Sequence, residues 1–206
     1  MDKYQDFVIK NGVFIGKFEE MYQRFPDPWL QESEQHNVNS YSRNIAIINL
    51  RLFKIGSVVE FGCGLGYFTN LIFQNIQDIK IKGIDVSPTA INKAKYLWPH
   101  LDFEVDKVQN IEKYANYDAV LFGEIMWYIL DDLDGIFKKM MRNFRGKYFL
   151  NNLVFYKGQQ QYGNKFFTNL KEFIEFVPFK LLGYSEATTV NDDTIETSTI
   201  FKIEEK

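Results

Sequence analysis

One short segment restricts the possible folds of this chain more than any other, the run Val58-Val-Glu-Phe-Gly-Cys-Gly-Leu-Gly66. Its first residues are apolar and β-branched, as in a buried strand. The glycines at 62, 64 and 66 let the backbone turn sharply and let a ligand approach main-chain amides. Residues 67–76 then carry apolar side chains at helical spacing, and the start of a helix offers free N–H donors. The segment predicts a strand, a ligand-binding turn and a helix, in that order.

The rest of the chain continues this alternation. Helical spacing of apolar residues predicts helices at 40–52, from 88 to before Pro99, at 131–144 and at 170–177. Apolar runs predict strands at 57–61, 81–84, 101–105, 117–122 and 147–154, and the segments 179–190 and 194–203 predict a hairpin around Asn191-Asp-Asp193. Ser87 and Pro88 suit the N-cap and the first position of a helix. Alternating strands and helices form parallel units, whereas a short turn joins antiparallel strands. We therefore expect an α/β fold with a mostly parallel seven-stranded sheet, helices on both faces and a C-terminal antiparallel hairpin.

The sequence supports more specific predictions for the helices at 40–52 and 131–144 and for residues 1–39. In the helix at 40–52, the apolar residues that recur at helical spacing are Tyr41, Ile45, Ile48 and Leu52. Residues 1–39 are polar and contain several Gly and Pro breakers, so we expect irregular structure there and one domain over residues 40–206. In the helix at 131–144, the acidic residues Asp131, Asp132 and Asp134 stand at the favoured end of the helix, and we expect no metal site.

The composition excludes several classes of protein. The chain has 206 residues, of which 46% are hydrophobic and 25% charged, as in one ordinary globular domain. A net charge of −3 argues against a sequence-independent grip on nucleic acid, although a local basic groove stays possible. No apolar run approaches the roughly 20 residues that span a bilayer. No signal peptide is recognisable and Cys63 is the single cysteine, so a cytoplasmic protein without disulfides is the default expectation. The oligomeric state stays open.

The spacing of the glycines argues against a dinucleotide cofactor. The dinucleotide fingerprint is G-x-G-x-x-G, whose last glycine allows close packing of helix on strand. Here the spacing is G-x-G-x-G, and Tyr67 occupies the position of that last glycine. The pattern does not favour a nicotinamide enzyme.

The segment EFGCGLGYFT at 60–69 resembles the first motif of class I S-adenosylmethionine-dependent methyltransferases, and the resemblance extends over residues 40–206. It implies a Rossmann-like fold, S-adenosylmethionine as cofactor and methyl transfer as the activity. In this family an acidic residue at the position of Asp85, in GIDVS, takes both ribose hydroxyls, and a carboxylate can accept two such hydrogen bonds. Asp106 matches the acid that meets the adenine amino group, and Glu60 matches the acid that orients the turn. The implied cofactor-binding residues are Glu60, Gly62, Gly64, Gly66, Asp85, Val86, Asp106, Gly123 and Trp29.

A second, shorter resemblance concerns the acceptor side. Gly123-Glu-Ile-Met-Trp-Tyr128, after the fourth strand, and Asp27-Pro-Trp29 are similar to segments of small-molecule methyltransferases of the nodulation protein S type. Open α/β sheets bind ligands at this carboxyl edge. We predict Glu124 and Tyr128 as catalytic residues, with Glu124 orienting the acceptor or taking its proton. From topology, the predicted acceptor-binding residues are Trp127, Tyr156, Gln159 and Tyr162.

Three functions remain open at this level. The first is methylation of an amine or hydroxyl on a small polar acceptor, such as a sugar or small metabolite. The second is methylation of RNA or protein, which usually employs an added recognition domain. The third is a non-catalytic cofactor-binding protein. The sequence contains neither an Asn-Pro-Pro-Tyr motif nor a Pro-Cys nucleophile after the fourth strand. Residues 1–39 are a candidate lid over the cofactor.

Overall fold

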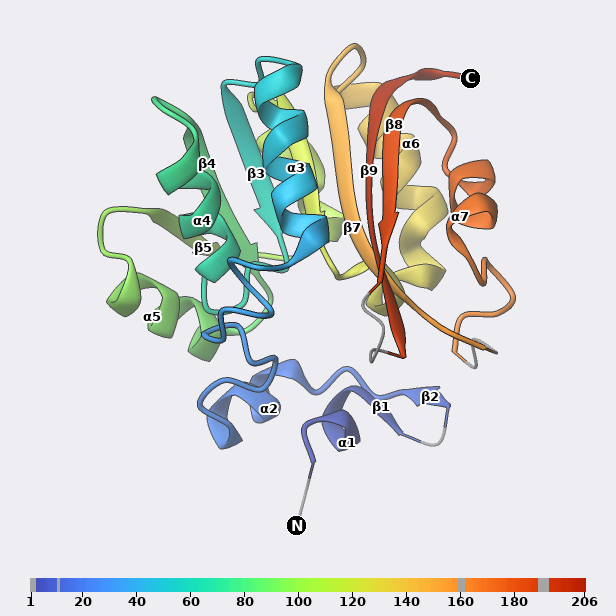
Figure 1. The fold of residues 1–206 in the computed structure, drawn as a ribbon. Helices are drawn as coiled ribbons and strands as arrows, with labels where there is room; N and C mark the ends of the chain where they lie inside the picture. The colour runs from blue at the N-terminus through green and yellow to red at the C-terminus, as the bar shows by residue number, and fades with distance from the viewer. Residues whose placement is uncertain (1–2, 11, 159–161, 189–192) are drawn as a thin grey trace.

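The computed structural model describes residues 3–10, 12–158, 162–188 and 193–206. Their main sheet has seven strands in the order β5-β4-β3-β6-β7-β9-β8 (Figure 1). The strands are β3 (Ser57–Phe61), β4 (Lys80–Asp85), β5 (Asp102–Val105), β6 (Ala119–Gly123), β7 (Tyr148–Tyr156), β8 (Phe179–Ala187) and β9 (Thr194–Glu205). All strands from β5 to β7 in this order are parallel, and β9 runs antiparallel to both β7 and β8. The predicted α/β fold is confirmed, while the predicted turn at 191–193 falls largely outside the described residues.

Helices cover both faces of the sheet. The α-helices of this part are α3 (Tyr41–Leu52), α4 (Tyr67–Asn75), α5 (Pro88–Leu97), α6 (Leu133–Asn143) and α7 (Leu170–Phe176). The 3-10 helices are η1 (Val108–Tyr114), η2 (Met126–Tyr128) and η3 (Leu130–Asp132). One face packs on α6 and α7 through a phenylalanine-rich core, and the other packs on α3 and α4. Ser87 caps α5 by accepting from the Ala90 N–H, as predicted. A search of the described helices finds none with the length and apolar character needed to cross a bilayer.

The helix at 40–52 is confirmed, but the apolar residues that recur at helical spacing do not form its inward face. Tyr41, Ile48 and Leu52 are 50%, 52% and 69% exposed. The inward face instead carries Ser42, Arg43, Ala46, Ile47 and Leu50. A polar first turn points inward because its partners on the sheet and in the N-terminal segment are themselves polar.

The described part of the N-terminal segment (residues 1–39) contains more regular structure than expected. It contains α1 (Gln5–Val8), the hairpin β1 (Ile9–Lys10) and β2 (Val13–Phe14), and α2 (Phe18–Arg24). Figure 1 shows these elements lying across the end of the sheet at which the arrow of β3 finishes. Two polar contacts hold α2 on α5: Glu19 accepts from the hydroxyls of Ser87 and Thr89, each at 2.6 Å, and Lys93 donates to three carbonyls at 22–26. The expected irregular structure is found over residues 25–40, whereas the helices and the hairpin that precede residue 25 were not predicted, because tertiary contacts hold them.

Candidate functional site

The turn after β3 leaves little of its backbone free. All but one of the N–H groups at 62–66 donate to acceptors in the same domain, the donors being Gly62, Cys63, Gly64 and Gly66. The exception is Leu65, whose N–H donates to Oε1 of Gln31 at 2.9 Å. The same carboxamide donates from Nε2 to the Cys63 carbonyl at 3.4 Å. A ligand therefore reaches this amide and this carbonyl by displacing Gln31, which sequence reasoning did not single out.

Gly64 is required by the approach of the N-terminal segment. Its φ is +55°, and a Cβ there would lie 2.6 Å from both Gln31 Oε1 and the Tyr22 hydroxyl. The two flanking glycines are required by packing within the domain. A Cβ on Gly62 would overlap Ile125, and a Cβ on Gly66 would overlap Phe103. Of the predicted glycine triplet, the middle residue faces the covered edge of the sheet and the outer two allow packing within the domain.

Asp85 is the last residue of β4, at the edge of the sheet that the N-terminal segment covers. It is 9% exposed, and its two carboxylate oxygens accept the N–H groups of Gly64 at 3.0 Å and Ser87 at 2.9 Å. Burial raises the pKa of Asp85, and these hydrogen bonds oppose the rise. Each carboxylate oxygen has two acceptor positions, so the group retains capacity for a diol. Beside it, the apolar side chains of Val86 and Val105 are 49% and 45% exposed.

Asp106 lies in a different environment from the one that the resemblance implies. Its Oδ1 accepts from Lys107 N–H and from Asn110, and its Oδ2 accepts from Lys113 and Tyr114. The Lys113 ammonium and these hydrogen bonds lower the pKa of Asp106 to about 2. Four partners use the acceptor capacity of one carboxylate. The structure thus gives Asp106 a role in fixing η1 after β5, and leaves it little capacity for an adenine amino group.

Glu60 is buried at the end of β3. Its side chain is 1% exposed, and Oε2 accepts from the Thr69 hydroxyl at 2.5 Å. Burial raises the pKa of Glu60 to about 7, although Thr69 and the Arg43 guanidinium both lower it. An acid at this position therefore fixes the start of α4 and remains partly protonated near neutral pH.

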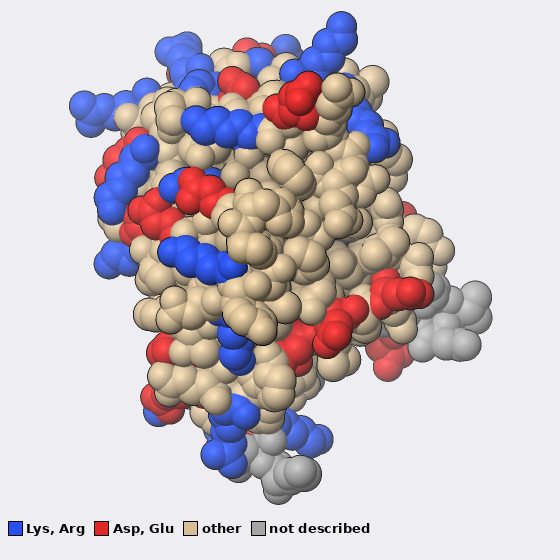
Figure 2. All heavy atoms as spheres, turned by 90° about the vertical axis from the view of Figure 1, so that its left-hand side faces the viewer, with Lys and Arg blue, Asp and Glu red and all other residues tan. Residues whose placement is uncertain are grey.

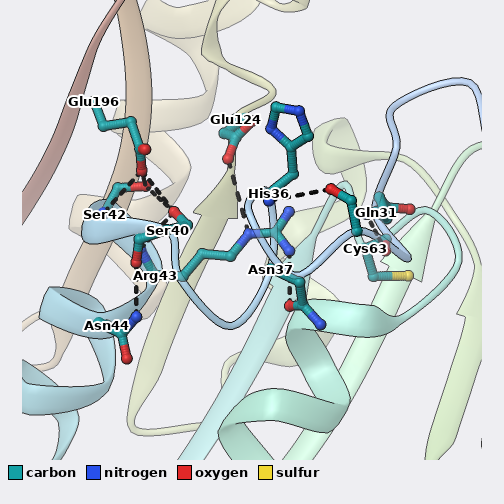
Figure 3. A network of polar contacts seen from close by, with 11 residues as sticks. Gln31, His36, Asn37, Ser40, Ser42, Arg43, Asn44, Cys63, Glu124 and Glu196 are labelled. Atoms are coloured by element: carbon teal, nitrogen blue, oxygen red, sulfur yellow. Dashed lines mark hydrogen bonds and ion pairs between the residues drawn. The ribbon is translucent and has the colours of Figure 1, made fainter. Parts of the chain in front are cut away.

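Arg43, on the first turn of α3, is the principal residue that the sequence did not reveal. Figure 3 shows its guanidinium between Glu124 and Asn37. Nη1 donates to Asn37 at 3.0 Å, whereas Nε has no hydrogen-bond partner among the described residues and lies 4.0 Å from Glu124 Oε1. The guanidinium also lies 5.1 Å from the Phe68 ring centroid. A buried cation with an unused N–H is suited to an anionic ligand group. Arg43 could be recognised only once the structure showed which face of α3 points inward.

Glu124 follows β6 in a strained conformation. Its φ is +63°, in the left-handed region that side chains other than glycine seldom adopt. The backbone is held there by its N–H, which donates to the Asn152 carbonyl at 3.2 Å. The side chain is 43% exposed and thus remains accessible. Strain of this kind, at a residue predicted from sequence to be catalytic, is typical of functional sites.

A polar pair lies directly behind this turn. Asn152 on β7 and Ser198 on β9 are register partners, and Asn152 is also paired with Gly123. Both side chains are fully buried. Neither the Asn152 amide nor the Ser198 hydroxyl has a hydrogen-bond partner within the described part of the chain. The structure places unused polar groups in the core here, at a cost in stability.

Aromatic rings close the acceptor side. The Tyr128 ring lies 6.0 Å from Phe14, 5.2 Å from Phe18 and 6.1 Å from Trp29, measured between centroids. Trp29 thus belongs to the N-terminal segment's contact with Tyr128. Burial, together with the nearby Glu124 charge, raises the pKa of Tyr128 far above its usual value, so its phenol stays protonated. It can donate a hydrogen bond but is no base.

The remaining predicted acceptor residues divide into three groups. Tyr156 is 56% exposed beyond the end of β7, and Tyr162 lies 6.5 Å from Phe14 between ring centroids. Trp127 is 8% exposed, donates to the Val154 carbonyl at 2.9 Å and packs on Phe167, so its contacts are those of a core residue and its role toward the acceptor stays a prediction. Gln159 lies outside the described residues.

Two further chemistries find little support. Cys63 is a free, buried thiol, and burial raises its pKa well above the usual value, so it is not a thiolate nucleophile. Within residues 3–10, 12–158, 162–188 and 193–206, no three His, Cys, Asp or Glu side chains are grouped to hold a metal ion.

The family model and the curated relatives that match this chain are all described as methyltransferases. Residues 58–146 match a family described as "Methyltransferase domain". The chain is 28% identical over 165 residues to malonyl-[acyl-carrier protein] O-methyltransferase 1 of Ilyobacter polytropus, covering 75% of this chain and 58% of that protein. It spans between 31% and 58% of the lengths of the curated relatives it matches.

Solved structures agree in fold. The PH0226 protein of Pyrococcus horikoshii superposes with a TM-score of 0.63 at 18% identity, covering 90% of this chain and 99% of that one. A TehB-like SAM-dependent methyltransferase of Corynebacterium glutamicum superposes with a TM-score of 0.62 at 15% identity, covering 91% of this chain and 99% of that one.

Proposed function

Because the chain carries a class I, Rossmann-like methyltransferase domain, whose cofactor is S-adenosylmethionine, we propose that it transfers a methyl group to an amine or hydroxyl of a small polar acceptor. The acceptor would be a sugar or another small metabolite. The observation that carries the proposal is the strained, accessible Glu124 at the carboxyl end of β6, across the same edge of the sheet as Asp85.

The described residues fit the cofactor. Asp85 has acceptor capacity for a ribose diol, and the exposed Val86 and Val105 offer apolar walls for a purine. The unpartnered Nε of the buried Arg43 suits the carboxylate of an amino-acid group. When bound, S-adenosylmethionine supplies an activated methyl group on a positively charged sulfur. We assign no nucleoside contact to Asp106, because its own neighbours use its carboxylate.

The protein's part in the reaction is to align the acceptor and to exclude water. Holding two reactants in the correct geometry contributes roughly 7–11 kcal/mol toward lowering a barrier of this kind. Glu124 would hold the acceptor group and receive the proton that it loses. Tyr128 stays a neutral phenol, so it would orient the acceptor as a hydrogen-bond donor. The aromatic rings of the N-terminal segment would keep water away.

We also propose that the N-terminal segment is a lid over the cofactor. The contacts of Glu19 and Lys93 with α5 and its N-terminus support this role. So does Gln31, which bonds the turn after β3. The cofactor would enter when these contacts open and would be covered when they close again.

Two other functions stay in view. The relative from Ilyobacter polytropus is named for O-methylation of a malonyl group on a carrier protein, and 28% identity favours a carried carboxylate as the second candidate acceptor. Methylation of RNA or protein is the third. On the face drawn in Figure 2, basic and acidic side chains are interspersed, without the continuous basic area that nucleic acid favours.

The test is release of S-adenosylhomocysteine from S-adenosylmethionine over small amines, sugar nucleotides, malonyl-carrier protein and bulk tRNA. Turnover on an amine or sugar is the expected result, and Glu124→Gln should reduce it at least about a hundredfold. Activity confined to malonyl-carrier protein or tRNA would contradict the proposed acceptor. Full turnover by Glu124→Gln would remove Glu124 from the mechanism.

A further inference from the structure

The acceptor side of the site combines aromatic faces with oxygen atoms. The Tyr128 ring is stacked on Phe14 at an interplanar angle of 15° and meets Phe18 edge-on at 65°. Trp29 lies against the same ring, tilted by 33°. Three of these four rings come from the N-terminal segment, so the wall is completed when that segment closes on the core.

The polar groups around Tyr128 carry negative charge or none. The pKa of Tyr128 is raised first by burial and then by the neighbouring Glu124 carboxylate. Glu124 is half-exposed, and its nearest cation, Arg43, stays at 4.0 Å. Arg43 is in turn fixed by Asn37 and lies over the Phe68 ring. The Glu124 carboxylate is therefore available to a second positive charge.

Aromatic faces and a carboxylate attract the same kind of ligand. A ring presents negative charge on its face and binds an ammonium group, most strongly when water is excluded. A carboxylate acceptor would instead meet the negative charge of Glu124 and the negative faces of the rings, both of which disfavour it. A neutral alcohol would gain little from either feature.

We infer that the acceptor of this site is a cationic amine, bound as an ammonium group between Glu124 and the rings of Phe14, Phe18, Trp29 and Tyr128. This inference rests on the proposed function and narrows it from amine or hydroxyl to amine. The acceptor nitrogen must lose a proton before it can form the new N–C bond. Glu124 would accept that proton. The nitrogen lone pair would then form the N–C bond to the methyl group that the bound cofactor would supply, and the electron pair of the broken S–C bond would stay on the sulfur, so that charge balances.

The rings are now in contact with one another, so a ligand enters by parting the N-terminal segment from the core. Phe14 is 38% exposed, which places it at the outer margin of the cluster. Closure around the ligand would then re-form the ring contacts on the ammonium group. Affinity for a cation should therefore depend on rings from both sides of the contact.

The experiment compares two probes of nearly equal shape, tetramethylammonium and neopentyl alcohol. Each is titrated by calorimetry into full-length protein saturated with S-adenosylhomocysteine. We expect tetramethylammonium to bind at least about tenfold more tightly than the alcohol. Equal affinity, or binding of the alcohol alone, would overturn the inference.

Single substitutions test whether Glu124 and the aromatic rings cause the preference for the cation. Glu124→Gln and Tyr128→Leu should abolish the preference for the cation, whereas Tyr128→Phe keeps a ring and should retain it. Phe18→Leu removes one ring from the N-terminal segment and serves if Tyr128→Leu fails to fold. The matched control is Tyr184→Leu, at an exposed tyrosine of the edge strand β8. Loss of preference in the control, or its persistence in both Glu124→Gln and Phe18→Leu, would contradict the inference.

The experiment distinguishes failure of the proposed methyltransferase function from failure of the amine-acceptor inference. Binding of S-adenosylhomocysteine is measured first, and its absence would refute the proposed function itself. If it binds but the cation shows no preference, the methyltransferase proposal stands and the amine acceptor is refuted.

Discussion

Glu60 shows how one buried side chain connects stability with the site. It lies at the end of β3, bonded to Thr69 and close to Arg43. In the folded protein its pKa is about 7, because burial disfavours the charged carboxylate. The unfolded chain releases this proton near the ordinary value of 4.5. The folded state therefore holds a proton that the unfolded state has already lost.

The sign of the resulting pH dependence follows from linkage. Between pH 4.5 and about 7 the folded state binds more protons, so the free energy of unfolding falls as pH rises. The loss amounts to about 3 kcal/mol. Urea unfolding at several pH values should show Glu60→Gln with a flatter profile in this window. Glu175→Gln, at an exposed residue, is the control, and an unchanged slope in Glu60→Gln would contradict the account.

Ser198 gives a second prediction at this scale. Its buried hydroxyl has no partner among the described residues, so Ser198→Ala should raise the free energy of unfolding by about 1 kcal/mol. The adjacent Thr199 is the matched contrast, because its hydroxyl donates to the Asn151 carbonyl at 3.2 Å. Thr199→Val should therefore lower stability by a similar amount. Chemical denaturation measures both, and destabilisation by Ser198→Ala would show that the hydroxyl is satisfied.

At the scale of elements, the sequence predicts what local periodicity determines. The strands β3 to β7 and the helices α3 to α7 were located within a few residues, because each buries one regular apolar face or run. The polar part of the inward face of α3 has no signal in the apolar periodicity, because Arg43 and Ser42 meet polar partners. Contacts between segments distant in sequence, such as Gln31 with the turn after β3, have no local signal. The positions of Asp85, at the end of β4, and of Glu124, directly after β6, were predictable because both lie at the carboxyl edge of the sheet.

The attachment of α2 to α5 yields a prediction for these elements. The Lys93 ammonium donates to the carbonyls of Tyr22, Phe25 and Pro26. Lys93→Met should loosen the N-terminal segment, speed tryptic cleavage after Arg24 and weaken S-adenosylhomocysteine binding several-fold. Lys95→Met, at an exposed position of α5, is the control. Unchanged cleavage and affinity in Lys93→Met would show that this contact does not hold the segment.

At the scale of the whole molecule, we propose that the carboxyl edge of the sheet and the N-terminal segment form one site. Three of the four aromatic rings, Gln31 and Glu19 come from the segment, whereas Asp85, Glu124 and the fourth ring, Tyr128, come from the sheet side. The sheet side has its own two cores, which the segment does not enter. The segment packs on the sheet side through a separate apolar cluster that includes Met21, Tyr22, Leu65 and Ala90, and we propose that its main contribution is to ligand binding.

Deletion of residues 1–38 tests this division. The helix α3 keeps its N-cap Ser40 and the Glu196 carboxylate that accepts from Ser40 and Ser42, so the sheet domain should remain folded. Cofactor affinity should fall, because the lid is lost. Circular dichroism and calorimetry measure the two effects, and affinity equal to that of the full chain would refute the lid.

The most direct test of the central claim is calorimetric binding of S-adenosylhomocysteine to the full chain and to Asp85→Ala. The account predicts a single site in the native protein and at least about a tenfold weaker affinity in Asp85→Ala, since hydrogen bonds to a charged group are lost. Asp134→Asn, at an exposed acid of α6, should bind as the native protein does. No binding by the native protein, or equal affinity in Asp85→Ala, would contradict the assignment of this edge of the sheet as the cofactor site.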